Sequence, residues 1–130
     1  MIVKPLSLLT NYEFDNRYVA DPLGNVYIYD ENIKDVSKYK KMKPYITRDG
    51  YVEFVLTDRY GKKKHIQGQR IIAGLFLPMV KDKLFVNHKN GIRNDNNVAN
   101  LEWVDRSENL LHSYRKLGRV PWNKKFITTS

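Results

Sequence analysis

The sequence has no cysteine and no long hydrophobic run, and both absences exclude whole classes of protein. Without cysteine the chain cannot form disulfides, use a thiolate nucleophile or bind zinc through sulfur. No segment approaches the roughly 18 apolar residues of a membrane span, and Pro5 interrupts the short apolar start without a small-residue cleavage site after it. We therefore expect neither a membrane protein nor a secretory signal, and the missing cysteine fits a reducing cytoplasm.

Acidic residues are also scarce relative to basic ones. The 130 residues include 23 Lys and Arg against 14 Asp and Glu, which gives a formal net charge of +9. Such an excess favours a polyanionic partner, of which nucleic acid is the commonest. An anionic membrane is a weaker candidate, because the sequence holds no basic helix with a continuous apolar face. With 42% apolar residues the chain can build the core of one domain or of two small ones.

The first half reads mainly as β-strands. Residues 12–80 hold aromatic and β-branched runs separated by turn signals, which favours a small antiparallel sheet. The hydrophobic period changes to that of a helix after Gln67, and Pro78 ends this short element. The turn signals are Asp21 to Asn25, Asp49–Gly50 and Tyr60–Gly61.

The second half reads as strand, polar loop, strand and helix. Two apolar runs, "KLFV" and "LEWV", flank an asparagine-rich loop at residues 89–99, and His88 stands at the end of the first run. Because Asn and Asp side chains hydrogen-bond to neighbouring backbone, residues 94–97 are expected to form turns and to take no part in chemistry. After the second run, Asp105 and Glu108 have the spacing of a capping box, which predicts the start of a helix.

The stretch "FVNHKNGIRNDNNVANLEWVDRSENLLHSY" resembles the motif of the HNH endonuclease family, in the form found in phage-borne and intron-borne homing endonucleases. The resemblance covers about residues 82–118 and implies a ββα-metal fold. The first half resembles the small module that often precedes this motif, through the turn at residues 24–26 and the helix "QRIIAGLF". Gln69 stands where many relatives carry His.

The expected fold class is therefore α+β, with a small N-terminal antiparallel sheet and a short helix followed by the ββα-metal motif. We assign residues 1–80 to a β-rich, DNA-contacting module and residues 81–118 to the nuclease motif. Residues 119–130 form a basic tail.

The resemblance implies a role for each polar residue of the motif. His88 corresponds to the general base, and Asn100 to the residue that fixes the loop and orients the histidine. Asn87 and Asn109 correspond to the ligands of a divalent metal, with His112 as a second candidate on the same face of the helix. An imidazole with a pKa near neutrality suits proton abstraction, and Mg²⁺, with Mn²⁺ as an alternative, prefers oxygen ligands.

Single residues of this set allow other interpretations. Asn100 alone could cap a turn, and His88 alone could be a hydrogen-bonded residue at a strand end. Neighbours on a strand face opposite ways, so Asn87 and His88 can share a site only where the strand ends. Many family members carry Asp at the position of Asn87, and an amide oxygen without net charge binds Mg²⁺ more weakly. A non-catalytic DNA-binding protein that retains the fold is therefore the alternative hypothesis, and an RNA-binding module is a third, based on charge alone.

Basic side chains cluster at the predicted turns, at the end of the second helix and in the tail. Any one cluster could be an ordinary solvated face, but as a set they predict contact with the backbone of double-stranded DNA. The expected protein is a monomer that acts in a bacterial cytoplasm if a phage encodes it. The predicted DNA-contacting residues are Lys38, Lys40, Lys41, Lys43, Arg59, Lys62, Lys63, Lys64, Arg115, Lys116, Lys124 and Lys125.

Overall fold

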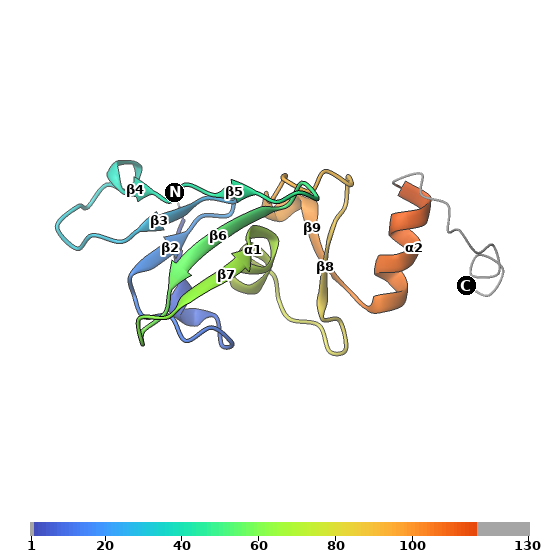
Figure 1. Cartoon of the computed structure of the whole chain (residues 1–130), viewed down its shortest axis with the longest axis horizontal. Coiled ribbons are helices and arrows are strands. Elements are labelled where there is room, and N and C mark those ends of the chain that lie inside the picture. Colours follow the sequence, from blue (N-terminus) through green and yellow to red (C-terminus); the bar gives the residue numbers. More distant parts are fainter. Residues whose placement is uncertain (1, 117–130) are drawn as a thin grey trace.

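The computed structural model describes residues 2–116, with side chains through residue 111, and shows an α+β fold (Figure 1). The strands of these residues form three small antiparallel sheets. The first sheet has the order β1-β2-β3-β4 and consists of Lys4–Pro5, Tyr18–Ala20, Val26–Ile28 and Lys40–Lys41. The second has the order β5-β6-β7 and consists of Tyr45–Ile46, Val52–Thr57 and Lys63–Gln67. The third pairs β8, Phe85–His88, with β9, Leu101–Val104.

Two α-helices accompany these sheets in the described part of the chain. Helix α1 spans Gly68–Phe76, and its chain leaves the helical conformation at Leu77, just before Pro78, as expected. Helix α2 spans Arg106–Lys116. Three short 3-10 helices lie at Leu6–Leu8, Val36–Lys38 and Val98–Asn100. None of the helices in residues 2–116 is long and apolar enough to cross a membrane.

The antiparallel strands of the first half are divided between two sheets, a division that the alternation of apolar residues does not reveal. A hydrogen bond of 3.0 Å from the backbone nitrogen of Thr57 to the hydroxyl of Tyr18 links them. Phe14 is fully buried between the sheets, with its ring 6.0 Å from those of Tyr12 and Tyr18. The two sheets therefore enclose a common aromatic core and act as one scaffold.

The turn between β2 and β3 forms around the buried carboxylate of Asp21. Its Oδ1 accepts hydrogen bonds from the backbone nitrogens of Leu23 at 3.0 Å and Asn25 at 2.9 Å, and its Oδ2 accepts one from the hydroxyl of Tyr27 at 2.7 Å. Burial favours a higher pKa for Asp21, but these hydrogen bonds outweigh it and the pKa is lowered. Gly24 adopts a φ of 108°, which side chains rarely tolerate, so this turn requires glycine.

The β8–β9 ribbon shares a hydrophobic core with the first half. Leu101 of β9 is 2% exposed and belongs to the same buried cluster as Phe54 of β6 and Ile71 and Ile72 of α1. Full burial of one such aliphatic side chain contributes about 1.5–3 kcal/mol. The predicted boundary at residue 80 falls in the connection between α1 and β8, but the core crosses it, so the two halves depend on each other.

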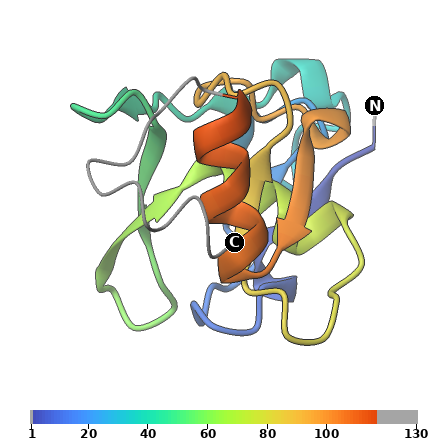
Figure 2. The ribbon, with the colours of Figure 1, turned by 90° about the vertical axis from the view of Figure 1, so that its right-hand side faces the viewer.

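Helix α2 packs on the side of the ribbon opposite α1 (Figures 1 and 2). The predicted capping box is confirmed at its start. The backbone nitrogen of Glu108 donates to Oδ1 of Asp105 at 2.8 Å, and Glu108 Oε1 accepts from the backbone nitrogen of Asp105 at 3.0 Å. Lys83 Nζ lies 2.8 Å from Glu108 Oε1, which ties the connection before β8 to the helix and lowers the pKa of Glu108. Strand, loop, strand and helix thus follow the predicted order.

Candidate active site

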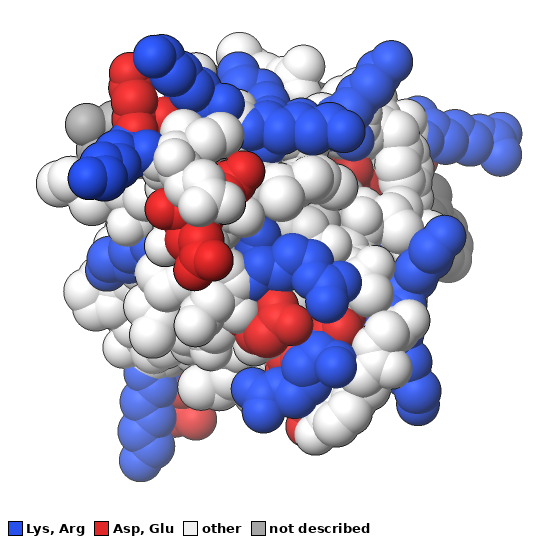
Figure 3. Space-filling model, turned by 90° about the vertical axis from the view of Figure 1, so that its left-hand side faces the viewer, with Lys and Arg blue, Asp and Glu red and all other residues white. Residues whose placement is uncertain are grey.

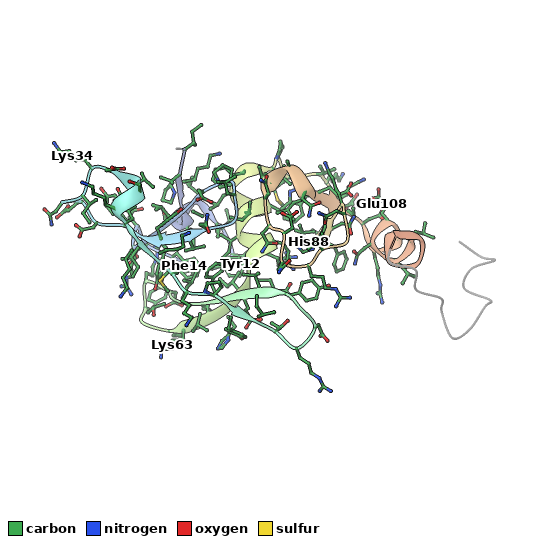
Figure 4. The ribbon with its side chains drawn as sticks, turned by 90° about the horizontal axis from the view of Figure 1, so that it is seen from above. Tyr12, Phe14, Lys34, Lys63, His88 and Glu108 are labelled. Carbon is green, nitrogen blue, oxygen red and sulfur yellow. The ribbon has the colours of Figure 1, made fainter. Side chains whose placement is uncertain are left out.

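His88 is the last residue of β8, where the strand gives way to the polar loop. Its side chain is buried, at 6% exposure, although it belongs to a predominantly polar segment. Ring nitrogen Nε2 lies 2.8 Å from Oδ1 of Asn96, and the ring centroid lies 6.1 Å from that of Tyr51. Figure 4 shows His88 toward the end of the molecule that carries α2. Asn96 and Tyr51 are thus among the neighbours of the imidazole, and Tyr51 belongs to the first half.

The ribbon directs Asn87 and His88 to different faces. Directly opposed residues of an antiparallel pair project to the same face, and the register pairs His88 with Leu101 and Asn87 with Glu102. Because Leu101 faces the core formed with α1, Asn87 and Glu102 project toward the α2 side. Asn87 and His88 can therefore border a common space only at the end of the strand, where His88 lies.

Asn87 is fixed by a carboxylate on the neighbouring strand. Its Nδ2 donates a hydrogen bond of 2.9 Å to Oε2 of Glu102, and the Asn87 side chain is 6% exposed. A carboxylate only accepts hydrogen bonds, so the amide group turns its NH₂ toward Glu102 and its carbonyl oxygen away. The pairing thus orients an oxygen donor and places a negative charge beside it.

Asn100 connects the two ends of the asparagine-rich loop. Its Oδ1 accepts from the backbone nitrogen of Asn90 at 3.0 Å, and its Nδ2 donates to Asn90 Oδ1 at 2.9 Å and to the carbonyl of Asp95 at 3.0 Å. Its own carbonyl accepts from the backbone nitrogen of Lys89 at 2.8 Å. Asn100 thus holds the chain directly after His88, and these contacts leave its role in orienting the histidine a prediction.

The remaining predicted metal ligands lie on α2. Asn109 is half-buried, and its backbone nitrogen donates to the carbonyl of Asp105 at 3.0 Å within the first turn of the helix. His112 lies three residues further along the same helix, and its side chain falls outside the described part of the structure. The packing of α2 against β8 brings the helix to the face that carries Asn87.

The donor set around Asn87 suits a hard divalent cation. Among the described side chains, no group of three or more His, Cys, Asp or Glu gathers in a metal-binding arrangement. The chemistry available is instead an oriented amide oxygen of Asn87 beside the carboxylate of Glu102, and Mg²⁺ accepts one or two such protein oxygens while it keeps several waters. The two oxygen donors that the structure describes here fit a magnesium-type ion.

The sequence did not indicate three residues that contact His88 or Asn87 in the candidate site. The expectation that residues 94–97 only form turns is incomplete, because Asn96 is 4% exposed and contacts His88. Tyr51 and Glu102 belong to no recognisable motif. The strand register identifies Glu102 as the partner of Asn87, and the packing of the loop brings His88 close to Tyr51. The density of asparagines marked the loop as a whole, and nothing in the sequence distinguished the one amide that is buried.

Most of the predicted DNA-contacting residues lie far from His88. Strand β4 and the turn between β6 and β7 lie at the end of the molecule opposite α2 (Figure 1), and Lys63 is labelled there in Figure 4. On this end, basic side chains lie next to one another along the upper edge, and acidic and uncharged groups lie between those below (Figure 3). Lys64 is half-buried and lies 3.8 Å from Asp58. The side chains of Arg115, Lys116, Lys124 and Lys125 lie outside the described residues, and the exposed members are Lys38, Lys40, Lys41, Lys43, Arg59, Lys62 and Lys63.

Comparison with curated proteins identifies relatives among virus, phage and prophage endonucleases. The chain is 30% identical over 108 residues to an uncharacterized HNH endonuclease of Acanthamoeba polyphaga mimivirus. The aligned region covers 83% of this chain and 30% of that protein. The chain is 30% identical over 97 residues to DNA endonuclease I-HmuI of Bacillus phage SP01, covering 75% of this chain and 51% of the relative. A putative HNH homing endonuclease of Bacillus subtilis, the SPbeta prophage-derived YosQ, is 33% identical over 76 residues, covering 58% and 44%. The chain thus spans about half or less of the length of these relatives.

A solved structure shares the architecture across the chain. The structure described as DNA binding and cleavage by the HNH homing endonuclease I-HmuI matches 99% of this chain and 67% of its own, with a TM-score of 0.73 and 26% sequence identity. The sequence model of the family described as HNH endonuclease matches residues 68–111, which contain α1, the β8–β9 ribbon and the start of α2. The chain belongs to the HNH endonuclease family.

Proposed function

We propose that this chain is a metal-dependent DNA endonuclease that hydrolyses phosphodiester bonds, with His88 as general base and single-strand nicks as its product. The observation that carries the proposal is the position of His88, buried at the strand end with its Nε2 held by Asn96. The solved structure of I-HmuI is described as showing DNA binding and cleavage, and the shared fold supports the same activity here. Action in a bacterial host cell is consistent with the phage and prophage relatives, and we propose that the protein acts as a monomer.

The proposed reaction assigns proton transfer to His88. A water molecule attacks the phosphorus, His88 takes the proton from this water, and the 3′ oxygen leaves. A neutral imidazole suits this step because its ordinary pKa lies close to physiological pH. Asn100 binds the loop that follows His88, and its proposed role is to keep the ring oriented at the strand end.

HNH nucleases generally use a divalent metal, and Asn87 and Asn109 are the residues proposed to hold it, with His112 as a further candidate. Such an ion would supply stabilisation of the charge that develops on the phosphate and the leaving oxygen. Glu102 orients the Asn87 amide and adds a negative charge beside it. Mg²⁺ is the expected ion and Mn²⁺ the alternative.

The direct test is cleavage of supercoiled plasmid with and without Mg²⁺ or Mn²⁺. Wild type should convert supercoiled DNA to the open-circular form only when the metal is present. His88→Ala should lose cleavage by about 10²-fold or more, while its affinity for the same DNA stays near that of wild type. Normal cleavage by His88→Ala would exclude His88 as the base.

One observation favours a second function, a DNA-binding protein without catalysis. The position expected to carry a metal-binding carboxylate carries the neutral Asn87. Cleavage by the Asn87→Asp variant distinguishes the two functions. If wild type does not cleave DNA and the variant cleaves it strongly, the non-catalytic alternative is supported. An active wild type that changes only modestly would support the endonuclease.

A further inference from the structure

Asn96 has a buried side chain that contacts His88. It is 4% exposed, whereas the other residues of the loop, 89–95 and 97–99, are half-buried or exposed. Its Oδ1 lies 2.8 Å from Nε2 of His88. The loop therefore sends one amide inward, and that amide meets the proposed base.

Two glycines of the first half make the space that Asn96 occupies. A Cβ on Gly68, at the start of α1, would lie 2.5 Å from Asn96 Nδ2, a distance that real Cβ contacts essentially never show. A Cβ on Gly24 would lie 3.1 Å from the Cβ of Asn96. The positive φ of Gly24 already requires glycine, but Gly68 has no such backbone requirement. Room for the Asn96 amide is therefore the reason that the structure offers for glycine at Gly68.

Stability does not explain why an amide fills this space. Nδ2 of Asn96 is buried and has no hydrogen-bond partner among the described residues. A buried donor without a partner costs about 1–3 kcal/mol, and a small apolar side chain would avoid this loss. The contact of Oδ1 with His88 is what distinguishes asparagine from such a residue.

The contact also favours one tautomer of the neutral imidazole. A neutral imidazole carries one N–H and one lone pair, and an amide oxygen can only accept a hydrogen bond. With Oδ1 at 2.8 Å, Nε2 of His88 is the donor, and the lone pair is on Nδ1. The hydrogen bond thus sets both the rotation of the ring and the nitrogen that can receive a proton.

A second contact from the first half acts on the same ring. Tyr51, next to the turn between β5 and β6, lies 6.1 Å from His88 between ring centroids, and the guanidinium of Arg93 lies 5.0 Å from the Tyr51 centroid. Arg93 Nη1 also donates to the carbonyl of Asp49 at 2.6 Å. The turn and the loop are therefore clamped together around His88.

We propose that Asn96 is a positioning residue that holds His88 as its Nε2–H tautomer with Nδ1 as the proton acceptor. Through Gly24 and Gly68, the first half of the chain then sets the orientation of the catalytic base in addition to any contact with DNA. The inference rests on the proposed function in one respect, that His88 is the base. Its structural part concerns the free protein and can be tested without cleavage.

The experiment compares Asn96→Ala, Gly68→Ala, the double variant and Gly74→Ala in the full chain. Asn96→Ala should lower kcat for plasmid nicking by about 10- to 100-fold, in the range known for residues that orient a reacting group, with little change in KM. Gly68→Ala should give a similar loss, because its new methyl group displaces the intact amide. The double variant should be no worse than Asn96→Ala, since truncation of Asn96 removes the clash.

Gly74→Ala is the matched control. It places a methyl group on the same helix, 2.6 Å from Leu9 Cδ2, and so disturbs core packing without touching Asn96. It should lower the melting temperature and leave kcat near wild type. A loss of kcat in Gly74→Ala equal to that in Gly68→Ala would overturn the inference, because general damage to α1 would then account for both.

Ring ¹⁵N NMR spectra of the free protein report the tautomer of His88. They distinguish a positioning role of Asn96 from a purely structural one, because loss of structural support alone would not change the tautomer. At a pH where His88 is neutral, wild type should show the Nε2–H tautomer, and Asn96→Ala and Gly68→Ala should show a mixture. An Nδ1–H tautomer in wild type, or a folded Asn96→Ala with normal spectra and kcat, would overturn the proposal. If wild type fails to cleave DNA, the proposed function fails, but the spectra still show whether Asn96 sets the tautomer of His88.

Discussion

Asn87 and Glu102 face each other across the β8–β9 pair, joined by a hydrogen bond of 2.9 Å from the amide nitrogen to the carboxylate. The position where many HNH enzymes carry Asp therefore keeps a negative charge within hydrogen-bond distance, on the neighbouring strand. A neutral Asn87 therefore does not leave this position without a nearby negative charge. In the proposed metal site, the Asn87 amide would supply an oriented oxygen and Glu102 would supply the charge that the amide lacks.

Glu102→Gln should weaken divalent metal binding. The substitution keeps the size of the side chain but removes its charge, and a glutamine can present either its oxygen or its NH₂ to Asn87. We expect the Kd for Mn²⁺ to rise by about tenfold or more, as for other residues that orient a metal ligand. Titration of the DNA-free protein, followed by Mn²⁺ electron paramagnetic resonance, measures this directly.

Glu31→Gln is the control for this charge change, because Glu31 is exposed on the connection between β3 and β4. It should leave the Kd for Mn²⁺ unchanged. Equal Mn²⁺ affinity in wild type and Glu102→Gln would show that Glu102 takes no part in the site.

Asn87→Asp should tighten Mn²⁺ binding and lower the melting temperature in EDTA, because two carboxylates then face each other without a cation.

Asn100→Ala should destabilise the loop that follows His88. The change removes three side-chain hydrogen bonds, to both the backbone and side chain of Asn90 and to the carbonyl of Asp95. With the partners left near solvent, we expect a loss of about 1–3 kcal/mol in the free energy of unfolding. Urea denaturation measures the loss. Asn94→Ala is the control, since Asn94 is exposed, and an equal loss there would contradict a special role of Asn100.

The sequence predicted the order of elements better than their assembly. Turn chemistry and period located the turn at Asp21, helix α1 and the capping box of Asp105 and Glu108, because these signals depend only on residues close in the chain. Neither the division into two sheets nor the packing of Leu101 against α1 follows from such signals. Both depend on which apolar faces meet after folding.

The candidate site shows the same limit. His88 and Asn100 are visible through the spacing of the HNH motif, but Asn96 is not, because its burial depends on glycines 72 and 28 residues earlier, Gly24 and Gly68. Glu102 emerges only from the register of β8 and β9. Local sequence therefore locates the residues of the motif, and tertiary contacts determine which side chains orient them.

Asp21→Asn should destabilise the protein at neutral pH and much less in acid. The folded-state pKa of Asp21 is lowered below 3.8, so its carboxylate contributes stability above that value and loses it as the pH falls through the folded pKa. At pH 7 the amide offers Tyr27 or Asn25 a poorer partner, with an expected loss of about 1–3 kcal/mol. The difference between the two proteins should shrink below pH 3.8.

Urea unfolding of both proteins between pH 7 and pH 3 tests this dependence. Asp30→Asn serves as the control, because exposed Asp30 also accepts a bond from a turn nitrogen, that of Asn32 at 2.9 Å. That variant should differ little from wild type at any pH. A constant difference between wild type and Asp21→Asn across the whole range would mean that the charge of Asp21 does not stabilise the turn.

The exposed lysines of the β6–β7 turn provide a test of DNA contact at the end of the molecule far from His88. Lys62 and Lys63 are exposed, whereas Lys64 is half-buried and lies 3.8 Å from Asp58. If Lys62 and Lys63 each contact a phosphate, Lys62→Ala combined with Lys63→Ala should weaken binding to duplex DNA regardless of sequence. The slope of log K against log salt should become shallower by about two, since each phosphate contact contributes about 0.9.

Lys81→Ala, which removes an exposed lysine outside the clusters, should leave the slope nearly unchanged. Cleavage at saturating protein should stay normal in the double variant, because the turn lies away from the base. An unaltered slope would restrict DNA contact to the other basic clusters.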